Sequence, residues 1–282
     1  MAGIIALYAD ERYDIARRIR MLEMQNAALN QFAQQAPFQY HWESAAILYE
    51  TGSAADSPSP YFWLNSGGLF FLEGGVGRTL QGALPKQSQW RLRYASANPQ
   101  DSIDGYYPQN IFRLLTKNVW LDVEHEAYFR IRAHNSGDSP NENASNGVFL
   151  MSRYRGDGQS AYLAGMRVDG ALVIKRKSDG AYATLAYQPH FGASPDAYRP
   201  HESLLPRDVW IGLRMVTVDE ADGVSISLFI DEGRSRAWKK ALGVIDAESD
   251  AMASDLHDPG HVGIRSDFMD IEIADWRLDA IR

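Results

Sequence analysis

Asp-Gly pairs punctuate this chain, and four of them, at Asp157-Gly158, Asp169-Gly170, Asp179-Gly180 and Asp222-Gly223, lie between short apolar or alternating runs. Asp-Gly suits a type I′ turn, because both central residues tolerate positive φ and the turn matches the twist of two paired strands. The first three pairs follow one another closely. The stretch 148–187 therefore predicts an antiparallel meander of about four strands.

Period-two patterns and short apolar runs predict strands on both sides of the meander as well. The expected strands are Leu69–Glu73, Trp90–Tyr94, Asn110–Leu115, Ala127–Ala133, Gly147–Tyr154, Ala161–Val168, Leu172–Lys177, Ala181–Tyr187, Val209–Val218, Val224–Asp231, His261–Ser266 and Met269–Leu278. The acidic segment Asp246–His257 is expected to be helical or irregular, and Val148–Met151 is apolar on both faces, which indicates a central strand. About a dozen short strands at this spacing predict an all-β, two-layer antiparallel sandwich.

The segment before the sandwich predicts one long helix. Asp10–Gln35 contains no Gly or Pro and Pro37 follows it. Ile15, Ile19, Leu22, Asn26, Leu29 and Ala33 form a heptad seam. A polar Asn in such a seam can fix register, so residues 12–33 could form a homodimer, or the helix could pack on its own domain. The apolar start before residue 9 could continue a membrane tether or simply begin the helix. We therefore divide the chain into a helix at 1–37, as coiled coil or membrane-proximal stalk, and a sandwich domain at 38–282.

Composition excludes several kinds of function. The net charge of −8 over 282 residues argues against nucleic acid as a partner. The chain has no cysteine, which excludes disulfides, thiolate metal sites and a cysteine nucleophile. It also contains no G-x-x-x-x-G-K-[ST], H-E-x-x-H or G-x-S-x-G motif.

A series of motifs in the C-terminal half points to a known fold. Trp210–Val216 is followed by Asp222-Gly223, Asp231, Trp238, Gly260–Arg265 and Asp270–Trp276. This order resembles the concanavalin A-like lectin/glucanase superfamily, including its laminin-G-like members, over about residues 60–282. The resemblance implies a jelly-roll sandwich that binds sugars, cleaves them or binds proteins. The paired-Glu strand of the superfamily's glucanases is missing, and Glu124 with Glu126 is the nearest pair. Of the two strand motifs of the jelly-roll lyases, one is absent and Ala161–Arg167 matches the other only in part.

The segment 128–177 is basic within an acidic chain. It holds eight basic residues (Arg130, Arg132, Arg153, Arg155, Arg167, Lys175, Arg176 and Lys177) against four acidic ones (Asp138, Glu142, Asp157 and Asp169). Strand alternation predicts that neighbours two apart share a face. Arginine forks bind carboxylate and sulfate, and tyrosine rings support sugar faces. We therefore expect one cationic face that binds an anionic polysaccharide through Arg130, Arg132, Arg153, Tyr154, Arg167, Lys175 and Lys177. The alternative is a solvated face that keeps the strands soluble.

Catalysis and metal binding rest on fewer residues. If the protein is a lyase or glycosidase, Tyr162 and His190 are the expected proton carriers, with Arg167 and Lys175 holding a substrate carboxylate. Asp267, Asp270 and Asp275 could hold a structural Ca²⁺ ion; no other cofactor is expected. The leading interpretation is an extracytoplasmic polysaccharide-binding protein that is periplasmic, membrane-anchored or secreted. A protein-interaction module of the bacterial cell envelope, assembling through the N-terminal helix, is the second.

Overall fold

The computed structural model describes residues 38–39, 46–193, 199, 201–247 and 256–281. The expected helix Asp10–Gln35, the homodimer seam at residues 12–33 and the tether before residue 9 lie outside the described residues. Within the described ranges, no helix is both long and apolar enough to cross a bilayer.

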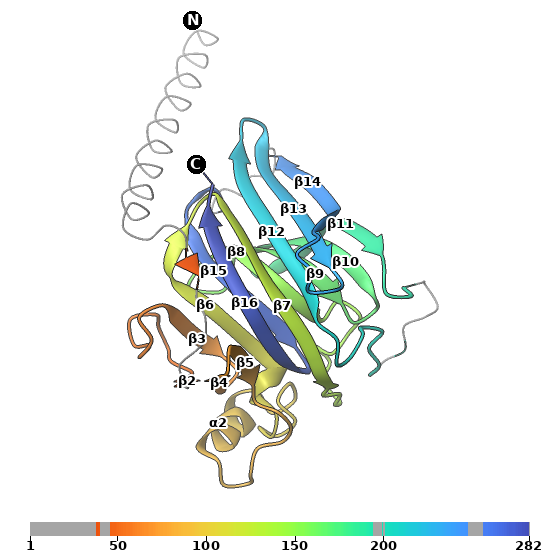
Figure 1. The fold of residues 1–282 in the computed structure, drawn as a ribbon. Coiled ribbons are helices and arrows are strands. Elements are labelled where there is room, and N and C mark those ends of the chain that lie inside the picture. The colour runs from red at the N-terminus through yellow and green to blue at the C-terminus, as the bar shows by residue number, and fades with distance from the viewer. Residues whose placement is uncertain (1–37, 40–45, 194–198, 200, 248–255, 282) are drawn as a thin grey trace, which may run out of the picture.

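Two antiparallel sheets lie face to face (Figure 1), so the predicted all-β sandwich is confirmed. The larger sheet has nine strands, and β1 pairs with β16 beside the main path. Its strands are β1 (Phe38–Gln39), β2 (Ala46–Tyr49), β4 (Leu69–Glu73), β5 (Val76–Thr79), β7 (Val123–His134), β12 (Ile211–Glu220), β13 (Gly223–Asp231), β14 (Lys239–Ala247) and β16 (Met269–Ala280). The order is β14-β13-β12-β7-β16-β5-β4-β2.

The smaller sheet has seven strands in the order β11-β10-β9-β8-β15-β6-β3. They are β3 (Phe62–Ser66), β6 (Ile111–Trp120), β8 (Gly147–Tyr154), β9 (Ala161–Arg167), β10 (Ala171–Ser178), β11 (Ala181–Pro189) and β15 (Gly260–Asp267). β8 lies inside this sheet between β9 and β15, and all its residues are buried, as the apolar run Val148–Met151 predicts. The last two strands, β15 and β16, thus run through the middle of different sheets.

The main core lies between the sheets and is built from alternate residues of each strand. β7 contributes Ala127, Phe129 and Ile131, and β9 contributes Tyr162, Ala164 and Met166. Their neighbours Arg130 and Leu163 point to the two opposite outer faces. A second apolar cluster covers the outer face of the seven-stranded sheet; it includes Trp63, Leu115, Phe149, Met151, Leu163 and Val173.

The predicted meander is confirmed as β8 to β11, joined by three turns that carry the Asp-Gly pairs. At Asp179 and Gly180 both residues have positive φ, 47° and 80°, as a type I′ turn requires. The fourth pair joins β12 to β13.

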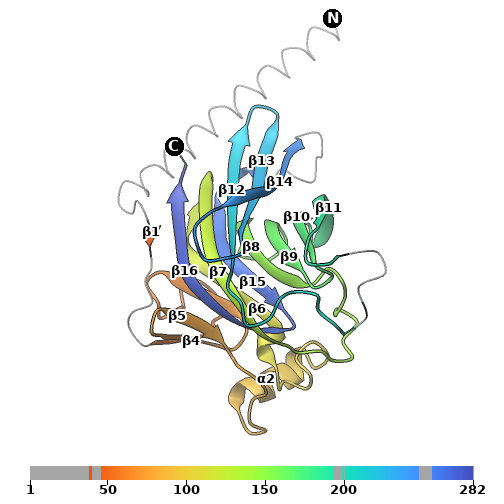
Figure 2. The ribbon, with the colours of Figure 1, turned by 45° about the vertical axis from the view of Figure 1, so that its right-hand side comes forward.

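Three sequence expectations differ from the structure. Trp90–Tyr94 is not a strand but part of helix α2 (Gln89–Ala97), which is followed by a short 3-10 turn, η1 (Pro108–Asn110). Only Tyr94 of α2 is buried. The helix propensity of the segment and the burial of this one side chain therefore decide its conformation, although its apolar residues alternate as in a strand. Lys239–Ala247 forms β14, so the acidic segment begins as a strand at Asp246. The short strands β3 and β5 were not expected. Figures 1 and 2 show α2 at one end of the sandwich, below β4 and β5.

Candidate functional site

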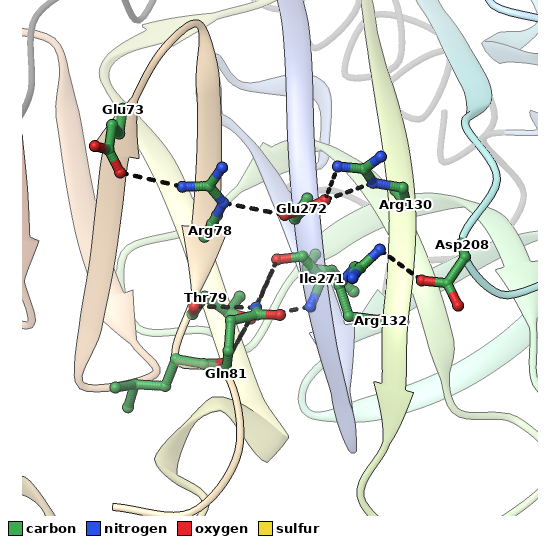
Figure 3. Close-up of polar contacts among 10 residues, drawn as sticks. Glu73, Arg78, Thr79, Gln81, Arg130, Arg132, Asp208, Ile271 and Glu272 are labelled. Carbon is green, nitrogen blue, oxygen red and sulfur yellow. Dashed lines mark hydrogen bonds and ion pairs between the residues drawn. The ribbon is translucent and has the colours of Figure 1, made fainter.

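The outer face of the nine-stranded sheet holds a chain of paired charges (Figure 3). Glu272 of β16 lies between two arginines: Arg78 Nε donates to it at 3.0 Å and Arg130 Nε at 2.5 Å. Arg78 also reaches Glu73 at 3.3 Å. Arg132 pairs with Asp208 at 2.5 Å. Arg130 and Arg132, two expected ligand-binding residues, are therefore both neutralised by carboxylates of the protein itself.

Arginines of this face also make cation–π contacts with tryptophan rings. The guanidinium groups of Arg130 and Arg234 lie 4.6 and 4.9 Å from the centre of the Trp210 ring, within cation–π range. Arg214 stacks in the same way on Trp238, at 4.6 Å, and pairs with Glu126. Arg130, Arg132, Arg214 and Arg234 are thus each paired with groups of the protein itself.

The other expected cations belong to the second sheet. Arg167, Lys175 and Lys177 project from β9 and β10 onto the outer face of the seven-stranded sheet, because their alternate neighbours Met166 and Ile174 fill the core. They therefore lie on the opposite side of the sandwich from Arg130 and Arg132. The expectation of one continuous cationic face is corrected: strand alternation was right for these residues of β7, β9 and β10, but β7 joins a different sheet from β8 to β10.

Arg153 is turned into the protein. An extra residue on β8 shifts its register against β15, where His261 faces Tyr154 but Gly263 faces Met151. Arg153 has φ 52° at this bulge, and such an insertion re-aims the following side chains. Arg153 is fully buried and donates to Asp219 at 2.6 Å and to the carbonyl of Leu256 at 2.6 Å. The expected surface role of Arg153 is therefore corrected to a buried structural ion pair.

Tyr154, next to the bulge, lies on the outer face. Its hydroxyl lies 3.3 Å from Arg113 Nη1, which donates to it, and 3.3 Å from Asn65 Oδ1, to which it donates. Among the binding candidates, Tyr154 and Lys175 both line cavities on this sheet.

Neither Tyr162 nor His190 lines one of these two cavities. Tyr162 points into the core and donates to Asp246 Oδ2 at 2.8 Å, and burial together with this bond raises the pKa of its hydroxyl. His190 Nε2 lies 3.2 Å from Glu232 Oε1, and its ring packs edge-on against Phe191. The expected role of Tyr162 as a proton carrier is corrected, because its side chain lies in the core and its neighbour Leu163 lines the groove instead.

A groove of about 510 Å³ lies on the outer face of the seven-stranded sheet. Its floor carries Phe149, Leu163, Lys175 and Arg265, and one rim is Tyr182, which is 48% exposed. Asparagines 141, 143 and 146 line the other side. Two carboxylates, Asp101 and Asp267, also line the groove. Amides, a tyrosine ring and cations are groups that bind sugar hydroxyls, sugar faces and acid groups.

Lys175 is the unusual residue of this groove. It is only 6% exposed, and its amine donates to the carbonyl of Ser145 at 2.6 Å and lies 4.5 Å from the centre of the Phe149 ring. Among the described residues no carboxylate forms an ion pair with it; Asp267 acts on it from further away and pairs with Arg265 at 2.8 Å. Burial lowers the pKa of the Lys175 amine to about 8.

Sequence reasoning missed Arg265 and Tyr182. Arg265 of β15 donates to the Tyr182 hydroxyl of β11 as well as to Asp267 Oδ1 of its own strand, so residues of two strands hold its guanidinium group in the groove. Arg265 ends the Gly260–Arg265 motif that carries the fold resemblance. That the Arg265 side chain lines the groove follows from the pairing of β15 with β8, which the sequence does not reveal.

Lys177 and Arg167 lie near the groove but have other partners. Lys177 donates to the carbonyl of Gly158 at 2.6 Å. Arg167 pairs with Asp169 at 2.7 Å. Both side chains order loops at the ends of the meander.

The three aspartates considered for calcium are separated by their partners. Asp267 pairs with Arg265; Asp270 accepts hydrogen bonds from Gly82 N, Gln109 and Asn135; Asp275 pairs with Arg234. N–H donors thus occupy oxygens that a cation would need. In the part of the chain that the structure describes, no three acidic or histidine side chains form a metal-binding group. These residues do not fit a calcium site.

Comparison with protein-family profiles and with curated protein sequences gave no match. Among solved structures, the chain is similar to a carbohydrate-binding module, CBM66, from Bacillus subtilis, with 14% identity, TM-score 0.41, 60% of this chain and 82% of that chain covered. It is similar to the exoplasmic/lumenal domain of VIP36 in its Ca²⁺-bound form, with 10% identity, TM-score 0.44 and coverages of 86% and 92%. The winged bean acidic lectin complexed with methyl-α-D-galactose shows 11% identity, TM-score 0.46 and coverages of 83% and 97%.

Proposed function

We propose that this protein binds an acidic polysaccharide in the groove of the seven-stranded sheet. Lys175 carries the proposal, because its buried amine faces the groove without a carboxylate partner among the described residues. A carboxylate or sulfate of a sugar would supply the missing counter-charge. A charge-assisted hydrogen bond of this kind contributes about 1.5–3 kcal/mol.

The groups around Lys175 suit the rest of a sugar. Tyr182 offers an exposed ring at the rim, and the asparagine amides both donate and accept hydrogen bonds. Several solved structures of similar fold are described as sugar-binding proteins, which is in keeping with this choice. Such a ligand places the protein outside the cytoplasm, among cell-surface or environmental polymers. We propose binding without cleavage, since the expected proton carrier Tyr162 lies on the core side of its strand.

A binding panel tests the proposal. The wild-type protein, Lys175→Met and Lys117→Met would be titrated with polygalacturonate, alginate, hyaluronan and a neutral glucan. Lys117 is a matched control, because it lies on β6 of the same sheet and its amine also donates to a backbone carbonyl, that of Ser57, at 3.3 Å. We expect Lys175→Met to weaken acidic-polymer binding about 10-fold to 100-fold, and Lys117→Met to bind like wild type.

Two measurements separate binding from loss of fold and from catalysis. Thermal unfolding of each variant shows whether it is folded, and new reducing or unsaturated ends report cleavage. Failure of the wild-type protein to bind any of the acidic polymers would overturn the proposal. So would equal binding by wild type and a folded Lys175→Met variant.

A further inference from the structure

A second cavity of about 310 Å³ lies on the same outer face. Asn65, Arg113 and Tyr154 line it from the sheet side, and Arg93, Tyr94 and Asn98 line it from helix α2 and the residue after it. It is thus the part of this face that helix α2 encloses.

The two cavities are neighbours in the strand register. Arg113 of β6 is the direct cross-strand partner of Arg265 on β15, and Arg265 is the partner of Phe149 on β8. The Lys175 amine lies over the Phe149 ring. Adjacent strands are about 4.8 Å apart, so the backbone positions of Arg113 and Phe149 are separated by two strand spacings, about 10 Å. This distance is roughly the length of a disaccharide.

Arg113 lacks an ion-pair partner among the described residues, as Lys175 does. Its Nη1 donates to Tyr154 Oη at 3.3 Å, and its Nε is buried without a hydrogen-bond partner among those residues. Burying an unpaired donor costs about 1–3 kcal/mol, so an incoming anion would be favoured there.

Two carboxylates line the cavity, Glu50 and Asp157. Asp157 is exposed and its Oδ1 accepts a hydrogen bond from Gln159 N at 2.9 Å, whereas Glu50 is engaged by several groups of the protein. Glu50 accepts hydrogen bonds from the backbone N–H groups of Gly67 and Gly68, each at 3.0 Å, and from the Tyr94 hydroxyl. Its other oxygen pairs with Arg93 at 3.0 Å. Glu50 therefore holds α2 against the sheet and leaves the Arg113 guanidinium group available to a ligand.

We propose that the Arg113 cavity is a second anion subsite, and that the protein binds an internal stretch of a linear acidic polysaccharide across both cavities. This inference rests on the proposed function. It specifies a ligand with acid groups on at least two sugars about 10 Å apart, in place of a single acidic sugar at a chain end.

Chain-length dependence tests the inference. Galacturonate and mannuronate oligomers of one, two, four and six sugars would be titrated into wild type, Arg113→Met, Lys175→Met and Arg155→Met. We expect wild type to bind the hexamer at least tenfold more tightly than the dimer. Arg113→Met should lose about tenfold for the hexamer and less than twofold for the dimer, whereas Lys175→Met should weaken both. Arg155→Met is the control, since Arg155 is a half-buried arginine that lines neither cavity and pairs with Asp258 at 3.7 Å.

The outcomes distinguish the two proposals. Equal affinity for dimer and hexamer, or an Arg113→Met loss that is the same for both lengths, overturns the second subsite and leaves the Lys175 groove standing. Failure to bind any oligomer overturns both. If Arg113→Met unfolds at a lower temperature, Arg113→Lys replaces it, and we expect that variant to keep most of the length dependence because it keeps the charge.

Discussion

His125 gives a sharp prediction about how stability depends on pH. Its ring is 1% exposed and lies between the sheets, because it alternates with the outward Glu124 and Glu126 on β7. Its cross-strand partners are Met215 and Leu278, both core residues. Neither ring nitrogen has a hydrogen-bond partner among the described residues. Burial lowers the pKa of His125 to about 3.

The sign and size of the effect follow from this pKa. Between pH 6.5 and 3 the unfolded chain binds a proton at His125 and the folded chain does not, so acid favours the unfolded state. From pH 7.5 to pH 5 the loss of unfolding free energy is about 2 kcal/mol, with a pKa of about 6.5 in the unfolded chain and about 3 in the folded one. The full contribution is present above pH 6.5 and disappears as the pH falls.

His125→Met removes this proton site while roughly keeping the side-chain volume. Urea unfolding of wild type and variant at pH 7.5 and pH 5.0 measures the difference. We expect the variant to gain about 2 kcal/mol relative to wild type on acidification. It should also be more stable at pH 7.5, by about 1–2 kcal/mol, since two unpaired polar atoms are gone. His261→Gln is the control: its ring is half-buried and its Nδ1 lies 2.8 Å from the Thr116 carbonyl, so we expect a smaller pH effect. The same pH dependence in wild type and His125→Met would refute the reasoning.

Three further predictions concern the groove and the sheets. Acidic-polymer binding by the wild-type protein should weaken as the pH rises through about 8, because Lys175 then loses its charge. The Lys175→Arg variant should bind with little change between about pH 7 and 9.5, because arginine keeps its charge. Isothermal titration calorimetry measures both affinities. Gly165→Ala should destabilise the fold by roughly 1–3 kcal/mol, since a Cβ there would lie 2.2 Å from the Val148 carbonyl oxygen, whereas Gly156→Ala has no atom within 4 Å and should be near neutral in chemical denaturation. Arg153→Met should cost about 3–5 kcal/mol in the same assay, because it removes the buried cation that pairs with Asp219 and Asp122. Arg155→Met, which loses a partly exposed pair, should cost less than about 1 kcal/mol.

The strands with clear alternation and turn chemistry were predictable from sequence. β8 to β13 carry Asp-Gly turns at four junctions, and their registers follow those turns. Helix α2 was not predictable in this way, because Trp90, Leu92 and Tyr94 alternate as in a strand. Helix propensity and the Tyr94–Glu50 contact decide its conformation. β14 escaped notice because its two lysines and Gly243 weaken the strand pattern.

The candidate site was predictable only in part, for a topological reason. Period two places Lys175 and Lys177 on one face, and this is what the structure shows. The same rule failed at Arg153, since one inserted residue on β8 reverses the alternation. It could not assign β7 to the other sheet, nor reveal that Glu272, 142 residues away, neutralises Arg130. Ion pairing depends on contacts between distant strands, which local patterns do not contain.

The contrast between two buried cations links stability to function. Arg153 meets Asp219 and Asp122, so its burial is compensated within the fold. Lys175 is nearly as buried without an ion-pair partner among the described residues, and a pKa lowered from 10.5 to about 8 corresponds to about 3 kcal/mol of unfavourable charge burial at neutral pH. Lys175→Met should therefore raise the free energy of unfolding while it weakens acidic-polymer binding, and Arg153→Met should lower stability. Such opposite effects are expected where a destabilising residue is kept for binding. A Lys175→Met variant that is less stable than wild type would mean that the amine holds the Ser145 loop in place, and the functional argument for Lys175 would fail.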